Sequence, residues 1–231
     1  MRRLLDTATL ESSAVVANSA MNRERQLDGV NSYARELGFN PLDWLLDRAG
    51  DKPDGVGWLD LCCGSGRALI RAAARLHRLG RTGAVTLAGV DLVDHFDPPG
   101  TAGLPPRLVC ASVADWTPNR RFDLITCVHG LHYVGDKLGV LARAAGWLTE
   151  HGRLVVDLDL DAVRLADGRP AGARLTRLLR AAGFTVDRRR RRVSRTGPAT
   201  ISLPYRYLGA DDRAGPNYTG QPAVNSYYIE S

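Results

Sequence analysis

The chain has 231 residues, of which 44% are hydrophobic and 24% charged, as expected for one globular domain with a sizeable core. This composition excludes an intrinsically disordered chain, a collagen-like repeat and a small disulfide scaffold. The formal charge is +6, but five consecutive arginines at residues 188–192 leave the rest of the chain at 6 − 5 = +1, so net charge alone does not indicate nucleic-acid binding.

The first 55 residues are predicted to form an N-terminal helical cap. Apolar side chains at helical spacing predict a helix over residues 22–38. Pro41 favours the start of a second, short helix, because proline suits the first helical position. The sequence Lys52-Pro53-Asp54-Gly55 predicts the turn that ends the cap.

Residues 56–208 alternate between short apolar runs and helical stretches. The predicted strands are residues 58–63, 84–91, 107–111, 122–128 and 153–160, and the predicted helices are 67–79, 136–148 and 171–182. Uninterrupted apolar strands are typical of sheets covered by helices on both faces. The pattern therefore predicts an α/β protein with a parallel, doubly wound sheet. Residues 95–100, which contain two prolines and a glycine, predict a loop where one crossover helix is missing.

The end of the chain has a different character. Residues 185–194 and 199–208 flank the turn signal Arg195-Thr196-Gly197-Pro198, which predicts a C-terminal antiparallel hairpin. Residues 209–231 are polar, and five of the seven tyrosines lie after position 204. We expect this polar aromatic tail to form a lid over an active site. The arginine run lies on the expected hairpin strand, where charges on a solvated face deter edge-to-edge aggregation.

The most informative motif is the apolar strand ending in Cys62-Cys63-Gly64-Ser65-Gly66. Glycines there allow a tight turn and close approach of the backbone to a ligand, and the following helix offers free N–H groups. Leu69 stands where a dinucleotide fingerprint has its third glycine, and no Gly-Lys-Ser/Thr sequence follows. The motif therefore predicts a nucleoside-type cofactor without a pyrophosphate.

The sequence from Leu59 to Gly66 resembles the first motif of the class I S-adenosylmethionine-dependent methyltransferases, and further motifs follow in order through residue 208. The resemblance implies a Rossmann-like sheet of seven strands and S-adenosylmethionine as cofactor. It also implies cofactor contacts from Asp60, Cys62, Gly64 and Gly66. Cys62 is a departure, since most members have a glycine at that position.

Asp91 ends the second predicted strand, where a carboxylate can accept both hydroxyls of a ribose. Leu92 follows it and is predicted to contact the same cofactor. In the family, an acid at the position of Ser112 commonly meets the adenine amine, and the next backbone N–H, here that of Val113, serves a ring nitrogen. Since Ser112 replaces the acid, Asp115 is either the displaced acid or a turn residue.

The loop after the fourth predicted strand contains the candidate general bases. By the resemblance, Val128 contacts the cofactor, and the adjoining loop faces the methyl-donating sulfonium. An imidazole titrates near neutral pH, so His129 or His132 can deprotonate a substrate hydroxyl or amine. In the alternative reading, one histidine shapes the cofactor pocket and the other caps the loop. No third ligand accompanies them, and we predict no metal site. Further catalytic candidates from the predicted lids are Tyr33, Tyr218 and Asn225.

The cysteines and the N-terminus indicate a cytoplasmic protein. Cys62, Cys63, Cys110 and Cys127 lack metal-ligand spacing, so we expect free thiols in a reducing compartment. Leu4-Leu5 is followed at once by Asp6, which is unlike a signal peptide. No apolar run approaches the ~20 residues of a membrane span. We expect a monomer or homodimer with neither a membrane nor a nucleic-acid partner.

The resemblance and the short chain favour methyl transfer to a small molecule, in bacterial secondary metabolism. The alternative is an intramolecular cyclisation, as in azetidine-2-carboxylate synthases, which share the implied fold. There the amino group of the cofactor's methionine part attacks its γ-carbon, releasing methylthioadenosine and azetidine-2-carboxylate. A third hypothesis is nucleic-acid methylation through the arginine run, which predicts binding that weakens steeply with salt.

Overall fold

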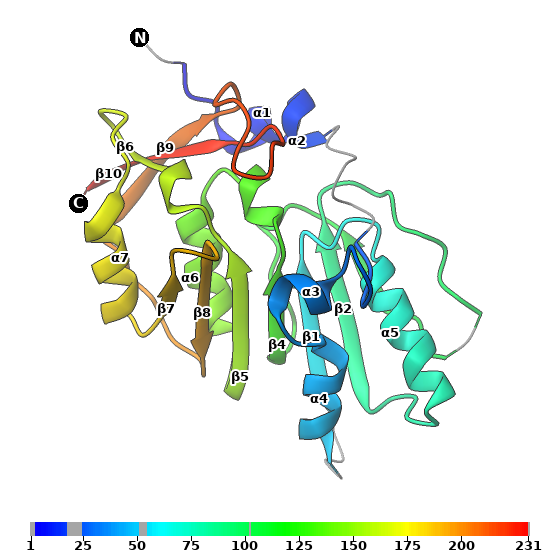
Figure 1. Ribbon diagram of the computed structural model, residues 1–231. Helices are drawn as coiled ribbons and strands as arrows, with labels where there is room; N and C mark the ends of the chain where they lie inside the picture. The colour runs from blue at the N-terminus through cyan, green and yellow to red at the C-terminus, as the bar shows by residue number, and fades with distance from the viewer. Residues whose placement is uncertain (1–2, 18–24, 51–54, 102, 231) are drawn as a thin grey trace.

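The computed structural model describes residues 3–17, 25–50, 55–101 and 103–230. Its centre is a seven-stranded sheet in the order β3-β2-β1-β4-β5-β8-β7 (Figure 1). The strands are β1 (Val56–Leu61), β2 (Val85–Asp91), β3 (Arg107–Cys110), β4 (Phe122–Cys127), β5 (Leu148–Asp157), β7 (Thr185–Asp187) and β8 (Arg192–Thr196). The Rossmann-like sheet of seven strands is thereby confirmed.

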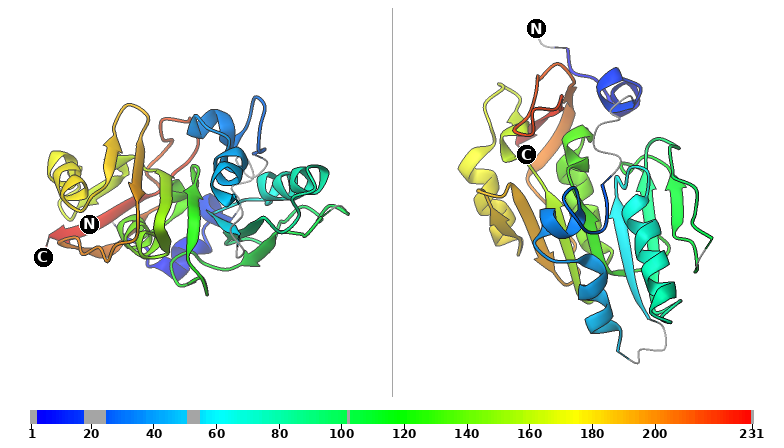
Figure 2. Two further views of the ribbon diagram at one scale, coloured as in Figure 1. Left: turned by 90° about the horizontal axis from the view of Figure 1, so that it is seen from below. Right: turned by 45° about the vertical axis from the view of Figure 1, so that its right-hand side comes forward.

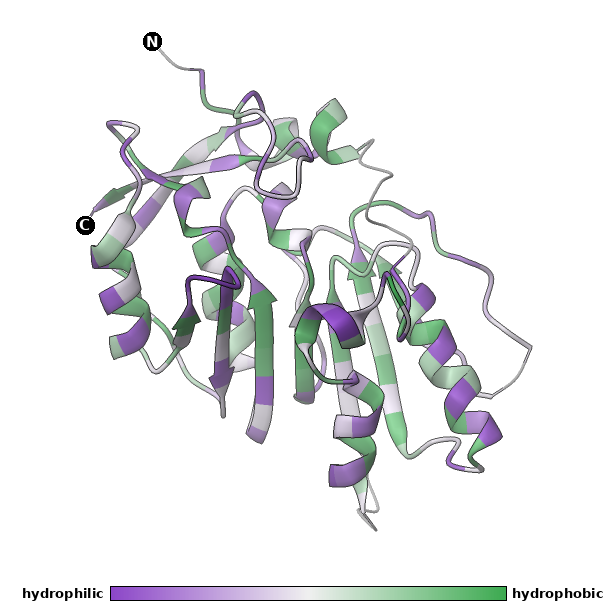
Figure 3. Cartoon of the chain, viewed as in Figure 1, coloured by the Kyte–Doolittle hydropathy of each residue, from purple (hydrophilic) through white to green (hydrophobic). Residues whose placement is uncertain are grey.

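The sheet is parallel from β3 through β5, and β8 runs antiparallel to both β5 and β7. Helices cover both faces: α4 (Pro41–Ala49) and α5 (Arg67–Arg78) pack on one, and α6 (Lys137–Gly146) and α7 (Gly172–Ala181) on the other. All six residues of β1 are buried, and the central strands are largely apolar in Figure 3. Burial on both faces explains why these strands lack polar alternation.

The helical cap differs from the prediction in its first part. The expected helix over residues 22–38 is shortened to α3 (Tyr33–Leu37), and residues 18–24 lie outside the described chain. Ser32 caps α3 by accepting the backbone N–H of Arg35, which ends helical geometry on its N-terminal side. The second helix, α4, begins at Pro41 as predicted, with Asn40 as its N-cap.

The segment between β2 and β3 contains no helix in its described residues, which confirms the predicted loop. A Cβ on Gly66, which precedes α5 with a φ of 72°, would lie 2.6 Å from a methyl carbon of Leu108 in β3. Glycine at this position therefore lets the β1–α5 loop approach the neighbouring strand closely.

The predicted hairpin is present but formed by different segments. Strands β7 and β8 pair antiparallel, and the arginines Arg188–Arg191 make the turn between them. The prediction that residues 199–208 form the second arm is wrong. Pro198 and Pro204 lack the N–H that a continuing ladder requires, and the chain leaves the sheet after β8.

A second, three-stranded sheet in the order β6-β10-β9 forms from β6 (Val163–Leu165), β9 (Tyr205–Asp211) and β10 (Asn225–Glu230). Two parts of the predicted tail, residues 209–211 and 225–230, are therefore strand. This sheet and the short helices α1 (Thr7–Glu11) and α2 (Ala14–Ala17) lie beyond the carboxyl ends of the central strands (Figures 1 and 2). Two backbone hydrogen bonds between Leu5 and Ala210 join the N-terminal segment to β9.

Among the described residues, no helix combines the length and the apolar character needed to cross a bilayer.

Candidate active site

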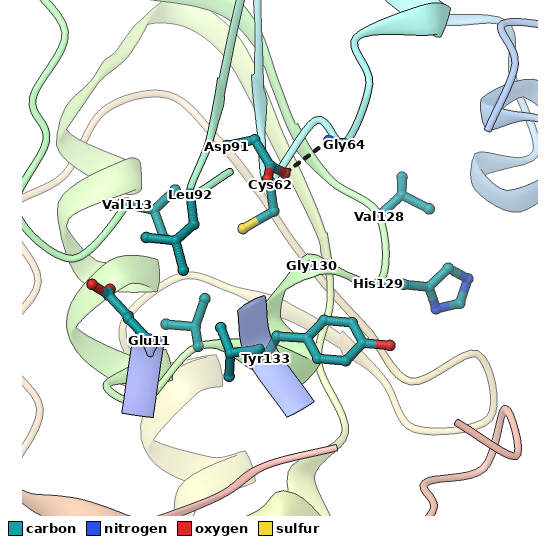
Figure 4. Close-up of a pocket in the computed structure, with 12 residues that line it drawn as sticks. Glu11, Cys62, Gly64, Asp91, Leu92, Val113, Val128, His129, Gly130 and Tyr133 are labelled. Carbon is teal, nitrogen blue, oxygen red and sulfur yellow. Dashed lines mark hydrogen bonds between the residues drawn. The ribbon is translucent and has the colours of Figure 1, made fainter. Parts of the chain in front are cut away.

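A cavity lies at the carboxyl ends of the central strands, below α1 and α2. It encloses about 680 Å³ of space not filled by atoms, part of it open to solvent. Figure 4 shows the side chains around it. The lining residues are Glu11, Val16, Cys62, Gly64, Asp91, Leu92, Val113, Val128, His129, Gly130, Tyr133 and Val134. Six predicted cofactor-binding residues are thus brought together: Cys62, Gly64, Asp91, Leu92, Val113 and Val128.

The loop after β1 forms one wall of the cavity. Cys62 has a φ of 56°, the left-handed conformation that a glycine at this position would adopt without strain. A Cβ on Gly130 would collide with the side chain of Cys62, so glycine there allows the ends of β1 and β4 to meet. A hydrogen bond with Cys127, together with burial, raises the pKa of the Cys62 thiol well above its ordinary value. Cys62 therefore lines the wall as a neutral thiol.

Asp91 fixes the turn of the same loop. One carboxylate oxygen accepts the backbone N–H of Gly64 at 2.8 Å, and the other accepts that of Val93 at 3.2 Å. The carboxylate thus lies in the cavity wall beside the loop, where a ribose hydroxyl can donate to it (Figure 4). The Asp91 carboxylate and the glycine-containing loop after β1 together fit the nucleoside part of S-adenosylmethionine.

The remaining predicted cofactor residues lie outside the cavity lining. Asp60 is buried beneath the loop and accepts hydrogen bonds of 2.6 Å from both Tyr33 and Thr126. Burial raises the pKa of Asp60 to about 7. Gly66 caps α5, and Asp115 is exposed. The Ser112 hydroxyl donates a hydrogen bond to the Glu11 carboxylate.

Tyr33 and Asn225, two of the catalytic candidates, are held in structural contacts. The Tyr33 hydroxyl is the donor to Asp60, and burial raises its pKa well above the ordinary value. Asn225 lies in β10 opposite Asp211 of β9. Neither residue lines the cavity, and their catalytic roles stay predictions.

His129 stands at the other side of the cavity with a positive φ of 61°, a conformation that is uncommon for non-glycine residues. Its Nε2 lies 3.4 Å from Oε2 of Glu36 and 4.0 Å from Oδ2 of Asp157. The hydrogen bond from His129 is the main cause that lowers the pKa of Glu36 to about 2, whereas burial raises the pKa of Asp157. The imidazole therefore faces at least one ionised carboxylate.

The other ring nitrogen of His129 belongs to a triangle with His132 and Tyr218. Its Nδ1 lies 3.5 Å from Nε2 of His132 and 3.4 Å from the Tyr218 hydroxyl, which is 3.3 Å from the same His132 nitrogen. Burial lowers the pKa of His132 to about 3, so this ring is neutral at neutral pH. The Arg191 guanidinium lies 4.1 Å from the centre of the Tyr218 ring.

Sequence reasoning missed the acidic residues Glu11, Glu36 and Asp157 of this site, and the lining residues Val16, Gly130, Tyr133 and Val134. A signal existed for Asp157, because it ends an apolar parallel strand as Asp91 does, and such ends meet at one edge of the sheet. Glu36 has no such signal, since it reaches His129 only through the packing of the cap.

Glu36, His129 and Asp157 present ligand atoms within 4.8 Å of one another, which a divalent cation could bridge. The same carboxylates already contact guanidinium groups. Arg25 lies 2.7 Å from Glu36, and Arg192 lies 3.1 Å from Asp157. Since each carboxylate has a positive partner, the charge that would attract a cation is largely balanced. The absence of a metal stays a prediction.

Comparisons with solved structures agree with the fold. Magnesium protoporphyrin IX methyltransferase from Synechocystis PCC 6803, with bound SAM, is 14% identical with a TM-score of 0.51, covering 86% of this chain and 100% of that chain. A plantazolicin methyltransferase in complex with a substrate analogue and SAH is 17% identical with a TM-score of 0.38, covering 46% of this chain and 40% of that chain. A sugar N-methyltransferase from Streptoalloteichus sp ATCC 53650 is 22% identical with a TM-score of 0.36, covering 50% and 46%.

The chain spans less than half the length of the last two proteins. At 14% identity, the likeness to the Synechocystis enzyme shows the fold alone. No curated protein matches the sequence significantly. A family model described as a methyltransferase domain matches residues 33–189, more than half of the chain, and includes the β1 loop, Asp91 and His129. The chain therefore belongs to the methyltransferase-domain family.

Proposed function

We propose that the protein binds S-adenosylmethionine in the cavity and transfers its methyl group to a small molecule. The observation that carries this proposal is one cavity with Asp91 and the Gly64 loop on one side and His129 on the other. The Asp91 carboxylate can accept hydrogen bonds from the hydroxyls of a ribose, and the His129 imidazole can take a proton from the methyl acceptor. S-adenosylmethionine would supply an electrophilic methyl carbon on a sulfonium.

The chain's own contribution is to align the acceptor and to take its proton. As the acceptor oxygen or nitrogen bonds to the methyl carbon, the carbon–sulfur bond breaks, and S-adenosylhomocysteine leaves. Nδ1 of His129 accepts the acceptor's proton, while Nε2 keeps its hydrogen toward Glu36, whose carboxylate stabilises the resulting imidazolium. His132, which is neutral at neutral pH, and Tyr218 fix the orientation of the His129 ring.

Two features support a small acceptor in the cytoplasm. The cavity is covered by α1 and α2, which contribute Glu11 and Val16 to its lining, and this suits a small metabolite better than a polymer. All four cysteines are unpaired, although the ends of β1 and β4 bring two of them close together, as expected in a reducing compartment. We further propose that the acceptor is a bacterial secondary metabolite.

The test is to incubate the purified protein with S-adenosylmethionine, with and without a panel of small phenols and amines, and to identify the products by mass spectrometry. We expect S-adenosylhomocysteine and a methylated acceptor to form together. The His129→Ala variant should lose about 10²–10⁴-fold in turnover, the usual contribution of a general base. His77→Ala, on the exposed side of α5, is the matched control. Release of methylthioadenosine without any acceptor would refute methyl transfer and support the cyclisation alternative.

A further inference from the structure

Glu11 brings an acidic side chain into the cavity from the N-terminal helix α1. Oε1 of Glu11 accepts the Ser112 hydroxyl, whose oxygen in turn accepts the backbone N–H of Ala114 at 3.0 Å. Among the described residues, no hydrogen bond reaches the other carboxylate oxygen, Oε2. Since Glu11 lines the cavity, this oxygen is available to a bound molecule.

Helix α1 is held firmly enough to position that carboxylate. Asp6 caps its first turn by accepting the backbone N–H of Thr9, and Leu10 is fully buried in a cluster with Val16, Ala210 and Val224. The two backbone hydrogen bonds between Leu5 and Ala210 hold the preceding residues against β9. Glu11 is therefore a fixed part of the wall and does not depend on a freely moving terminus.

The order of the strands indicates which part of a nucleoside lies beside Glu11. Asp91 ends β2 and is placed to bind the ribose, while His129 follows β4 at the reacting end. The base must then extend from the ribose away from β4, toward the end of β3, where Ser112 and Val113 lie. Figure 4 shows Glu11, Val113 and Leu92 together on that side, opposite His129.

The walls on this side suit a flat aromatic ring with one polar edge. Val16, Leu92 and Val113 provide apolar surface, and the Glu11 carboxylate provides only hydrogen-bond acceptors. A purine whose exposed edge carries an amine donates to such a carboxylate, whereas a carbonyl oxygen at the same position would face it without a hydrogen.

We propose that Glu11 accepts the hydrogen bond of the exocyclic amine of adenine and so makes the cavity specific for adenosyl ligands. This inference rests on the proposed function, because it assumes an adenosyl cofactor. It assigns the role to α1, which precedes the sheet in the chain, and not to Asp115, whose side chain is exposed and outside the cavity lining.

The experiment compares the binding of S-adenosylhomocysteine and S-inosylhomocysteine by calorimetry, without any turnover. The two ligands differ at the position of the amine, which is a carbonyl in the inosyl compound. The wild-type protein should bind the adenosyl ligand at least ~10-fold more tightly. In Glu11→Ala this ratio should fall to near 1, mainly because adenosyl binding weakens.

Two further variants make the comparison specific. Glu11→Gln keeps an acceptor for the amine and gains a donor for the carbonyl, so it should retain adenosyl binding while the inosyl ligand binds more tightly. Thr9→Ala changes the exposed face of the same helix and should leave the ratio as in the wild type. Thermal melting checks that each variant is folded.

The outcomes separate this inference from the proposed function. A wild-type protein that binds neither ligand would refute the adenosyl cofactor and with it the proposed function. Tight adenosyl binding with an unchanged ratio in Glu11→Ala, or no discrimination in the wild type, would refute only the role of Glu11. A ratio lost in Asp115→Ala and kept in Glu11→Ala would transfer the role to Asp115.

Discussion

The Tyr33→Phe substitution tests whether Tyr33 is a structural or a catalytic residue. The change removes only the hydroxyl that donates to Oδ2 of Asp60 at 2.6 Å, at a site where both residues are buried. Because Thr126 donates to the other oxygen of the same carboxylate, the loss leaves Asp60 with half of its hydrogen bonds. We expect a less stable enzyme with nearly unchanged turnover.

The expected cost depends on pH through Asp60. Burial raises the pKa of Asp60 to about 7 from 3.8, so the native state holds a proton that the unfolded chain has lost between about pH 4 and 7. The stability from this proton falls as pH rises through that window. A hydrogen bond to a charged group contributes about 2 kcal/mol and one to a neutral group about 1 kcal/mol. The Tyr33 hydroxyl therefore contributes more to the free energy of unfolding above pH 7, where Asp60 is ionised.

In a chain of this size, about 2–4 °C of melting temperature corresponds to 1 kcal/mol. Tyr33→Phe should therefore melt about 6 °C lower than the wild type at pH 8.5 and about 3 °C lower at pH 5.5, as measured by circular dichroism. Tyr207→Phe is the matched control, because the buried Tyr207 hydroxyl has no hydrogen-bond partner among the described residues, and its loss should not lower the melting temperature. Unchanged melting of Tyr33→Phe at both pH values, with turnover reduced a hundredfold, would refute the structural assignment.

Three further predictions concern the site and its support. Asp91→Asn should weaken S-adenosylhomocysteine binding at least ~10-fold in calorimetry, since the loop and the ribose both lose a charged acceptor; unchanged affinity would contradict ribose binding by Asp91. Treatment with EDTA should leave methyl transfer unchanged, because Arg25 and Arg192 already neutralise the carboxylates beside His129; inactivation reversed by one added metal would show a metal site. Burial lowers the pKa of Lys137 to about 7, so the unfolded chain binds the extra proton between about pH 7 and 10.5 and stability should rise with pH there, by up to about 1.4 kcal/mol per pH unit. Lys137→Met should remove this rise in urea unfolding, and an equal slope in both proteins would contradict the assignment.

The arginine run shows how tertiary structure changes the meaning of a sequence feature. As a sequence it predicts a solvated, strand-edge charge cluster, and Arg188, Arg189 and Arg190 are indeed exposed in the β7–β8 turn. The last two members instead point toward the site. Arg191 stacks on Tyr218, and Arg192 pairs with Asp157. Part of the basic run therefore balances the carboxylates around His129.

Local patterns were enough to predict the central sheet, the β1 loop and Asp91. Each depends on residues close together in sequence: an apolar run for a strand buried on both faces, glycines for a turn, and an acid at a strand end. The same reasoning placed the start of α4 at Pro41, because proline suits the first helical position.

Only the tertiary structure decided which side chains meet at His129 and Ser112. Glu36 comes from the cap, Asp157 from β5 and Tyr218 from the loop before β10, and Glu11 is 101 residues from Ser112. No periodicity in the sequence encodes such contacts, because they depend on how separate elements pack. The same holds for the C-terminal strands. After β8 the chain leaves the central sheet, and β9 pairs with β10 in the second sheet because packing brings these two strands together.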